Sequence, residues 1–578
     1  MQYSSIPLAQ SIVKLCISKG ITDVVISPGS RNAPLTITFS NHPTINAYSI
    51  VDERSAAFFA LGMAQQQAKP VALVCTSGSA LLNYYPAIAE AYYSDIPLVV
   101  ISADRPAERI DIGDGQTIRQ KNVYQNHILY SANLYSELAD SLGLDEKIKQ
   151  KSFEVSKLNE REINLALNTA IEKNGPVHIN VPFYEPLYNL TDGLEVSPIE
   201  IKPITEEKEI NDASLKAYSE IWSKAKRKLV LVGVNQPDSI TQEYLDWLAE
   251  DPSVLVFTET TSNLHHSDFI TRIDKLIAPL EQKENSDEWF KKLQPDILLT
   301  IGGHVISKKI KAFLRKYQPK HHWHIDAKKA LNTYFCLDRH FEVSPNVFLN
   351  KLKQQASYPK NAVYKDFWCS QAQERDKHHD KFMESLAYSD LKVFYYLNKH
   401  FPAQQVLQLS NSSIIRYAQL FKFSPEVAIY CNRGTSGIDG STSTAVGSAH
   451  KASLPTTFIT GDLSFFYDSN ALWNAYIPNN FKMIVINNQG GGIFRILPGA
   501  KEVTNFDTYL ETTHQLTAEH IAKMHRIAYF RQEGEQGLED TIQRFLNEET
   551  GQPKLLEIFT PRTENDQYLR NYFKTIFP

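Results

Sequence analysis

Short, unbroken apolar runs recur along the whole chain and limit the folds that it can adopt. Residues 24–26, 98–101 and 229–232 are examples, and helical segments separate one run from the next. A strand with one wet face alternates apolar and polar residues, whereas a strand covered on both faces is apolar throughout. The sequence therefore predicts an α/β fold class with doubly wound domains and mainly parallel sheets. The unbroken apolar runs are 24–26, 71–74, 98–101, 177–179, 229–232, 254–256, 297–299, 406–409, 427–429, 458–459, 484–486 and 555–558, and residues 47–51 form a further expected strand.

These runs fall into three groups, and a chain of 578 residues is long enough for three domains of ordinary size. The irregular segment 188–205 follows the first group, and the polar stretch 351–380 precedes the third. We expect both segments to be linkers. The predicted domains are residues 1–187, 206–352 and 380–578.

Charge and composition exclude several classes of function. The net charge is −5 with acids and bases interspersed, so no basic stripe indicates nucleic acid and no polybasic segment indicates anionic lipid. No stretch approaches the ~18–20 apolar residues of a membrane span, and the first residues lack a signal-peptide pattern. The 5 cysteines are scattered without CxxC spacing, which is typical of a reducing compartment. We therefore expect a cytoplasmic protein with small-molecule substrates.

Histidines occur in three groups along the chain, and grouped histidines can bind zinc. His322 and His324 alternate on an expected strand and so share a face, with His321 beside them. No cluster supplies further zinc ligands in the sequence, and we expect solvent-facing polar residues instead. The pairs at 265–266 and 378–379 receive the same interpretation.

Two expected strands end in oxygen donors. Asp462 follows the run 456–461, Asn488 follows the run 482–487, and Gly490–Gly492 come next. One strand–helix–strand crossover fits between Asp462 and Asn488, and such a crossover brings both strand ends to the same edge of a parallel sheet. These donors suit a small divalent cation, and glycines let the backbone approach phosphate. Because Asp, Asn and Gly are also the usual turn residues, this pair alone does not separate a metal–diphosphate site from two strand-closing turns.

Cations lie close to many of the other expected strand ends. Guanidinium groups bind carboxylates with two parallel hydrogen bonds, so several of them at one sheet edge predict a site for more than one carboxylate. Glu53 opens the expected helix 55–67, where an acidic residue is commonly favoured only by the helix dipole. The cations concerned are Arg31, Arg105, Lys308, Arg416 and Arg433.

Taken together, the motifs SPGSR, DER, ADRP, SNSxxxR, NRGxSGIDG, GDLS and NNxGGGIF resemble those of thiamine-diphosphate-dependent enzymes of the pyruvate oxidase and decarboxylase type. Their order and spacing are most similar to the branch of that family that acts in menaquinone (vitamin K2) biosynthesis. The resemblance spans residues 1–578 and is least marked from about 190 to 400. It implies a pyrimidine-binding domain, a central domain and a diphosphate-binding domain, in a homodimer or homotetramer with active sites between subunits.

The resemblance also implies roles for single residues. Glu53 would hydrogen-bond the aminopyrimidine ring of thiamine diphosphate, and Ile438 would hold the cofactor bent. Asp462, Asn488 and the Gly490 carbonyl would bind Mg²⁺ or Mn²⁺. The other cofactor-binding residues would be Ser412, Gly461, Leu463, Ser464, Ile493 and Phe494; the substrate-binding residues would be Ser30, Arg31, Arg105, Gln116, Lys308, Arg416, Arg433 and Leu497; and the catalytic residues would be Glu53, Arg31, Gln116, Arg416 and Arg433.

Some positions depart from the family pattern. Gly115 stands where some members carry an asparagine beside the glutamine. Leu463 replaces the second glycine of the GDG motif, as is usual in the menaquinone branch. Lys309 is adjacent to Lys308, so either lysine could face the site.

The implied reaction is the thiamine-diphosphate-dependent decarboxylation of 2-oxoglutarate and the 1,4-addition of the resulting succinyl carbanion equivalent to isochorismate, which makes the protein a transferase. Both substrates are dicarboxylates, which accounts for the number of cations. One alternative is an acetolactate-synthase-like enzyme or 2-keto-acid decarboxylase that uses the same cofactor on a smaller keto acid. A binding module without activity is the other alternative, and Glu53 together with Asp462 and Asn488 argues against it.

Overall fold

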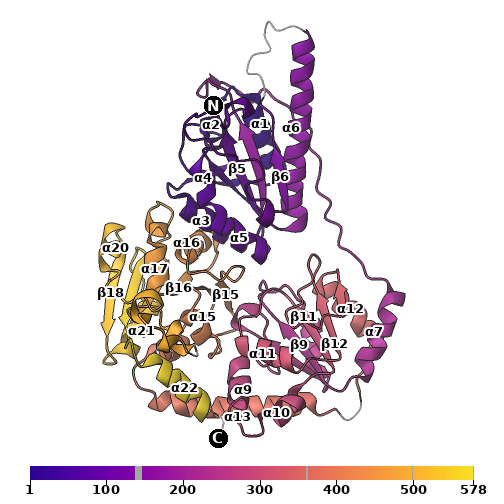
Figure 1. Cartoon of the computed structure of the whole chain (residues 1–578), viewed down its shortest axis with the longest axis vertical. Coiled ribbons are helices and arrows are strands. Elements are labelled where there is room, and N and C mark those ends of the chain that lie inside the picture. Colours follow the sequence, from indigo (N-terminus) through magenta and orange to yellow (C-terminus); the bar gives the residue numbers. More distant parts are fainter. Residues whose placement is uncertain (137–145, 360–361, 498, 577–578) are drawn as a thin grey trace.

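The computed structural model describes residues 1–136, 146–359, 362–497 and 499–576, which form three α/β domains (Figure 1). The N-terminal domain lies at the top of Figure 1, above the C-terminal domain on the left and the central domain on the right. Each domain is built on one sheet whose described strands are all parallel. The predicted fold class is confirmed, whereas the exact domain boundaries stay predictions.

The N-terminal domain has a 6-stranded sheet in the order β3-β2-β4-β5-β7-β6. Helices α1, α2 and α6 pack on one face of this sheet, and α3, α4 and α5 pack on the other. A short antiparallel pair, β1 with β8, lies outside it. The elements are β1 (Tyr3–Ser4), α1 (Pro7–Ser18), β2 (Asp23–Ile26), α2 (Ala33–Ser40), β3 (Asn46–Ser49), α3 (Glu53–Gln67), β4 (Val71–Cys75), α4 (Ser79–Asn83), α5 (Tyr85–Ser94), β5 (Leu98–Asp104), β6 (Tyr130–Asn133), α6 (Glu146–Lys173), β7 (Val177–Pro182) and β8 (Leu190–Thr191).

The central domain has a 5-stranded sheet in the order β10-β9-β11-β12-β13. Helices α7, α8 and α12 cover one face, and α9, α10 and α11 cover the other. The elements are α7 (Asp212–Lys224), β9 (Lys228–Val232), α8 (Gln242–Glu250), β10 (Val254–Thr258), α9 (Ile273–Leu280), α10 (Ser286–Leu293), β11 (Ile297–Ile301), α11 (Lys308–Lys316), β12 (His321–Ile325), β13 (Arg339–Phe341) and α12 (Pro345–Gln355).

The C-terminal domain has a 6-stranded sheet in the order β15-β14-β16-β17-β19-β18. Its helices α14, α15, α21 and α22 share one core, and α16 faces the N-terminal domain. The elements are α14 (Asp390–His400), β14 (Gln405–Leu409), α15 (Ser413–Ala418), β15 (Val427–Cys431), α16 (Ser441–Lys451), β16 (Thr456–Gly461), α17 (Asp462–Tyr467), β17 (Lys482–Asn487), α18 (Ile493–Ile496), α19 (Phe506–Tyr509), α20 (Glu519–Met524), β18 (Ala528–Glu533), α21 (Leu538–Asn547), β19 (Lys554–Phe559) and α22 (Asn565–Thr575).

Every expected apolar run lies in a strand. The strands that the apolar runs did not indicate include β6, β13 and β18, which lie at sheet edges. An edge strand is covered less completely, so it keeps polar residues and loses the continuous apolar signal. The edge position explains why these strands were missed.

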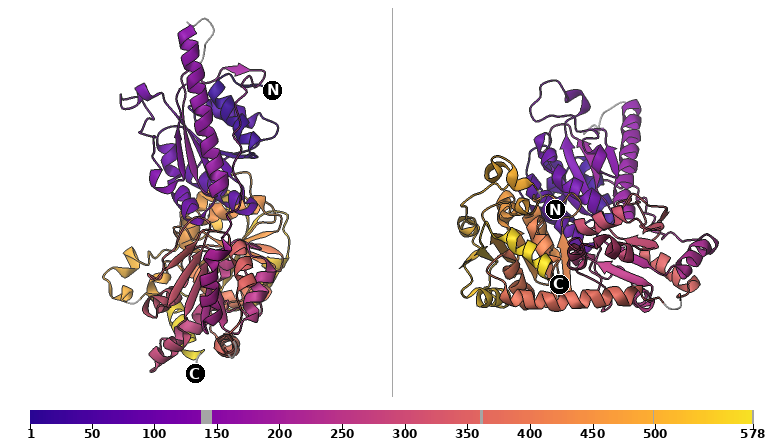
Figure 2. Two further views of the ribbon diagram at one scale, coloured as in Figure 1. Left: turned by 90° about the vertical axis from the view of Figure 1, so that its right-hand side faces the viewer. Right: turned by 60° about the horizontal axis from the view of Figure 1, so that its bottom comes forward.

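The interpretation of residues 351–380 as a linker was wrong. Residues 364–385 form the 22-residue helix α13 (Tyr364–Ser385), which extends along the bottom of the molecule in the right-hand view of Figure 2. Trp368 and Met383 are fully buried, Asp376 pairs with Lys275 of α9 at 2.8 Å, and the His379 ring lies 2.7 Å from the Tyr572 hydroxyl. The helix therefore packs on two domains. Its sequence is polar overall because only a narrow stripe is buried.

The expectation of solvent-facing histidines was also wrong for His322, His324 and His379, which are buried. His322 Nε2 lies 3.0 Å, and His324 Nδ1 2.8 Å, from the Thr300 hydroxyl of the neighbouring strand β11. Burial lowers the pKa of each of these two rings to about 4. The rings are therefore neutral polar groups inside the sheet, each with one nitrogen bonded to Thr300, while His322 Nδ1 and His324 Nε2 have no hydrogen-bond partner among the described residues.

The N-terminal and C-terminal domains meet where α3 packs on α16. A Cβ atom added to Gly447 of α16 would lie 2.0 Å from the Phe59 carbonyl oxygen, and one added to Gly62 of α3 would lie 2.0 Å from the Thr444 carbonyl oxygen. Both glycines therefore allow a backbone-to-backbone approach that no other residue permits. This contact fixes how one domain sits on the other.

Gly447→Ala should force the two helices apart and destabilise the folded chain by about 1–3 kcal/mol, the scale for overpacking a tight interior. The midpoint of urea denaturation measures the effect. Gly193→Ala is the matched control, because a Cβ atom at Gly193 would meet nothing within 4 Å. Equal midpoints for the two variants would show that the helices do not depend on this close approach.

Candidate functional site

A cavity of about 340 Å³ lies at the carboxyl ends of β14, β16 and β17. Asp462 begins α17 directly after β16, and Asn488 follows the parallel neighbour β17, so the crossover brings the two side chains to one edge as expected. Every cofactor-binding residue proposed from the sequence lines this cavity except Glu53. The cofactor-binding candidates that line the cavity are Ser412, Ile438, Gly461, Asp462, Leu463, Ser464, Asn488, Gly490, Ile493 and Phe494.

Hydrogen bonds hold the two candidate metal ligands in place. Asp462 Oδ2 accepts from the Gly490 N–H at 3.0 Å and lies 3.3 Å from His514 Nε2, while its Oδ1 accepts from the Leu463 N–H at 2.6 Å. Asn488 donates its amide N–H to Asp390 Oδ2 at 2.9 Å. The amide oxygen of Asn488 consequently remains available to a cation.

Asp390 is a cavity residue that the sequence reasoning missed. It is buried, and burial raises the pKa of its carboxyl group to about 6, with Asp462 adding to the rise and hydrogen bonds from Thr560 and Asn488 opposing it. In the sequence it follows Ser389 at the start of α14 and looks like an ordinary helix N-terminus. Two carboxylates, an amide oxygen and glycine carbonyls form a donor set that fits Mg²⁺ or Mn²⁺.

The glycine run beside these ligands has a conformation that requires glycine. Gly490 has φ +154°, and a Cβ atom there would lie 2.8 Å from the Glu511 carbonyl oxygen. The Gly491 N–H donates to the same oxygen at 2.6 Å. Two further residues at or beside the cavity, Ser412 and Ser436, have φ of 69° and 62°. Such backbone strain is concentrated at binding sites, where surrounding contacts hold it in place.

A first group of substrate candidates lies in the N-terminal domain. Ser77 connects two of them, because its hydroxyl donates to the Gln116 carbonyl at 2.9 Å and accepts from Arg105 Nη1 at 3.3 Å. Arg31 is buried and pairs with Glu185 at 2.9 Å. Ser30 and Gln116 are exposed. The structure therefore places these residues together near the carboxyl ends of β2 and β5. They belong to a different domain from the candidate metal ligands.

A second group lies where the central and C-terminal domains meet. Burial lowers the pKa of Arg416, and the neighbouring Arg433 lowers it further. Burial likewise lowers the pKa of Lys311, with Glu259 opposing the change and both arginines adding to it. Because the three cations are close enough to repel one another, an anion placed among them would be stabilised.

Lys311 was missed in the sequence, although it follows Lys308 by one helical turn. Lys308 itself is exposed, and Lys309 pairs with Glu281 on the neighbouring helix. The i, i+3 spacing places Lys308 and Lys311 near each other along α11 and could have indicated the second lysine. The choice between Lys308 and Lys309 as a substrate contact stays a prediction.

Glu259 holds the turn that begins α11. Its carboxylate accepts from the backbone N–H groups of Ile306 at 2.6 Å and Ser307 at 2.7 Å. Burial raises the pKa of Glu259 to about 7, and the charge of Arg433 partly opposes the rise. Glu259 thus anchors the segment that carries Lys308 and lies beside the cations.

This shifted pKa predicts a pH dependence of stability. The folded protein holds the Glu259 proton up to about pH 7, whereas the ordinary value is 4.5, so the free energy of unfolding should fall as pH rises through this window. Glu259→Gln cannot ionise. Its urea-denaturation midpoint, relative to that of the parent, should therefore rise between about pH 5 and about pH 8. A difference that does not vary with pH would contradict the assignment.

Several residues proposed from the sequence lie apart from the cavity within one chain, and their roles stay predictions. Glu53 lies half-buried at the start of α3 and does not line the cavity. Among the described residues, no hydrogen bond or ion pair joins Arg31, Arg105 or Gln116 to the cavity. Leu497 caps α18 next to the cavity residues Ile493 and Phe494.

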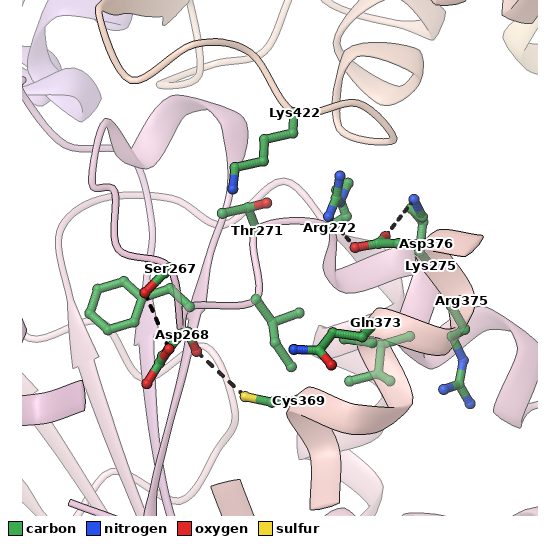
Figure 3. A pocket seen from close by; sticks show the side chains of 14 residues that line it. Ser267, Asp268, Thr271, Arg272, Lys275, Cys369, Gln373, Arg375, Asp376 and Lys422 are labelled. Carbon is green, nitrogen blue, oxygen red and sulfur yellow. Dashed lines mark hydrogen bonds and ion pairs between the residues drawn. The ribbon is translucent and has the colours of Figure 1, made fainter. Parts of the chain in front are cut away.

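A smaller cavity of about 150 Å³ lies between α9, α13 and Lys422 (Figure 3). It also contains cations, but Arg272 and Lys275 both pair with Asp376, at 2.5 Å and 2.8 Å. None of the site residues proposed from the sequence lines it. We therefore assign the functional site to the larger cavity and its neighbouring cations.

Three family models match the chain in order. They are the N-terminal TPP binding domain of thiamine pyrophosphate enzymes over residues 6–130, the middle domain over residues 202–409 and the C-terminal TPP binding domain over residues 412–558. The chain belongs to the thiamine-diphosphate-dependent enzymes. Within the described ranges, no helix combines the length and the apolar character needed to cross a bilayer.

Individual relatives show to which branch of this family the chain belongs. The chain is 59% identical to the 2-succinyl-5-enolpyruvyl-6-hydroxy-3-cyclohexene-1-carboxylate (SEPHCHC) synthase of Christiangramia forsetii over 99% of both chains. It is 50% identical to the enzyme of that name from Flavobacterium johnsoniae over 100% of both chains, and 37% identical to that of Porphyromonas gingivalis over 96% of this chain and 95% of the relative. The chain is thus a member of the SEPHCHC synthase family.

Proposed function

We propose that this protein decarboxylates 2-oxoglutarate and adds the remaining four-carbon unit to isochorismate, which yields SEPHCHC and carbon dioxide in menaquinone biosynthesis. The observation that carries the proposal is the contact between a cation and the cavity with the metal donors. Arg433 Nη1 donates to Asn411 Oδ1 in the cavity wall at 2.6 Å, and Arg416 and Lys311 lie near enough to Arg433 to interact with its charge. Such a group suits dicarboxylate substrates beside a metal–diphosphate cofactor.

The cavity has the donors that the cofactor needs. Asp462, Asn488 and the Gly490 carbonyl would bind Mg²⁺ or Mn²⁺, and the backbone of the glycine run would approach the diphosphate. Ile438, 38% exposed in the cavity wall, would support the bend between the cofactor rings. When bound, thiamine diphosphate supplies the carbanion that adds to the keto carbon and the electron sink that lets carbon dioxide leave.

Glu53 would hold a proton at the ring nitrogen of the aminopyrimidine and so favour the tautomer that acts as a base. Because Glu53 does not line the cavity of its own chain, we propose that Glu53 of the partner subunit completes each site. A homodimer or homotetramer would then contain two or more identical sites. A cytoplasmic location is part of the same proposal and rests on the scattered cysteines.

The arginines would position both substrates. Arg416, Arg433 and Lys311 from one chain would face Arg31 and Arg105 from the other, with Ser30, Gln116 and Lys308 as further polar contacts. Guanidinium groups bind each carboxylate bidentately and offset the repulsion between two dianions in a confined site. The binding energy of the distal carboxylates would also hold the reacting carbon atoms near each other.

Donor selectivity tests the function. If the cations bind dicarboxylates, 2-oxoglutarate should be decarboxylated far better than pyruvate, because pyruvate leaves at least one cation without a partner, at a cost of roughly 2–5 kcal/mol. Carbon dioxide release should be measured with each keto acid, with and without isochorismate, and with thiamine diphosphate omitted as the control. Equal rates for both donors would favour the acetolactate-synthase-like alternative, which needs fewer cations.

Glu53→Gln should retain cofactor binding but lower kcat by several orders of magnitude, because an amide cannot take part in the proton transfer at the ring nitrogen. Calorimetry measures the first property, and steady-state kinetics the second. Glu288→Gln is the matched control, because Glu288 also lies in the first turn of a helix, α10. Activity of Glu53→Gln close to that of the control would remove Glu53 from the catalytic set.

A further inference from the structure

The loop between β15 and α16 carries residues of both functional groups. Arg433 belongs to the substrate cations, and Ile438 lines the cofactor cavity. The Ile438 carbonyl accepts from the Ser464 hydroxyl at 2.8 Å, which ties the end of the loop to the cavity. The conformation of residues 432–437 therefore affects the positions of both Arg433 and Ile438.

A side chain from the N-terminal domain holds this loop. Glu90 of α5 is 1% exposed. Its Oε1 accepts from the Gly434 N–H at 2.7 Å, and its Oε2 accepts from the Thr435 N–H at 2.7 Å and from the Thr435 hydroxyl at 2.8 Å. The Ser94 hydroxyl donates to Oε1 at 2.7 Å. All of these are donors to a single carboxylate, and three of them belong to the loop.

Close packing accompanies the hydrogen bonds. A Cβ atom added to Gly434 would lie 2.6 Å from the Glu90 carbonyl oxygen, so the loop backbone lies directly on α5. Among the described residues Glu90 forms no ion pair. Its charge is instead stabilised by backbone and hydroxyl dipoles, which bind a carboxylate in one geometry and lose that geometry when either oxygen is replaced.

The other two domains also contact the loop. Asn411 donates to the carbonyls of Asn432 and Gly437, each at 2.7 Å, and its Oδ1 accepts from Arg433 Nη1 at 2.6 Å. A ring nitrogen of His304, from the central domain, lies 3.0 Å from the Arg433 carbonyl oxygen. Asn411 thus orients the guanidinium, while Glu90 fixes the backbone immediately after it.

We infer that Glu90, in the N-terminal domain, is a positioning residue. Through the loop of the same chain it holds Arg433 where this residue can bind a substrate carboxylate. The inference rests on the proposed function only for the role of Arg433. Within the described part of the chain, the side chain of Glu90 is hydrogen-bonded to Ser94, Gly434 and Thr435, none of which lines the cavity, so Glu90 acts through the loop. A shift of α5 would therefore move a substrate contact in another domain.

The first experiment is the kinetics of Glu90→Gln. Glutamine is as large as glutamate, but its amide NH₂ group would face an N–H donor of the loop. One of the hydrogen bonds that hold the loop would therefore become a repulsive contact. We expect kcat/KM to fall about tenfold or more, chiefly through a higher KM for whichever substrate Arg433→Gln affects. Glu160→Gln is the matched control, because Glu160 is a buried glutamate of the N-terminal domain that contacts Lys157 and the Ile199 N–H. Its KM values should equal those of the parent.

The double variant separates positioning from general destabilisation. If Glu90 acts through Arg433, then Glu90→Gln should have little further effect on kcat/KM once Arg433 is glutamine, because the effects of coupled residues are not additive. An equal fall in kcat/KM in both backgrounds would overturn the inference. Ser94→Ala is a milder second variant, which removes a donor to Glu90 and should raise the same KM less.

Amide hydrogen exchange tests the anchor without any reaction. In Glu90→Gln the Gly434 and Thr435 amides lose acceptors, so exchange of a peptide spanning 432–437 should accelerate, whereas Glu160→Gln should leave it unchanged. Unchanged exchange in Glu90→Gln would overturn the inference. If the parent protein fails to convert 2-oxoglutarate and isochorismate, the proposed function fails while this measurement still decides the role of Glu90.

Discussion

The backbone contact between α3 and α16 is the constraint on which the rest of the arrangement depends. Gly62 and Gly447 allow the two helices to touch, so the N-terminal domain has one position on the C-terminal domain. That position places α5 over the loop 432–437, where Glu90 can bind two consecutive backbone N–H groups. A bulkier residue at either glycine would move the anchor as well as the helices, because packed interiors transmit displacement rather than absorb it.

Buried carboxylates that bind pairs of backbone or hydroxyl donors recur around the site. Glu90 holds one loop, Glu259 holds the start of α11, and Asp468 binds the N–H and hydroxyl of Ser443 at 2.7 Å and 2.9 Å at the start of α16. Burial raises the pKa of both Glu259 and Asp468 to about 7. These groups position segments that carry cations or cofactor contacts.

The sequence predicted the features that depend on neighbours along the chain. Unbroken apolar runs located the buried strands, and the crossover rule brought Asp462 and Asn488 to one cavity. Features that depend on distant partners were missed: Glu90 and Gly434 are 344 positions apart, and no local pattern connects them. Helix α13 was read as a linker for the same reason, since its buried stripe contacts two domains that lie far from it in the sequence.

The position of Glu53 follows from the same helix contact. Glu53 opens α3, and the close approach of α3 to α16 fixes it outside the cavity of its own chain. Bringing it into that cavity would require α3 to leave α16, which would expose the apolar core that the two helices share. The free energy needed to expose such a core is far larger than the free energy that one catalytic contact could supply. A second chain that supplies Glu53 completes the proposed site while retaining this packing, and we therefore expect the active unit to contain at least two chains.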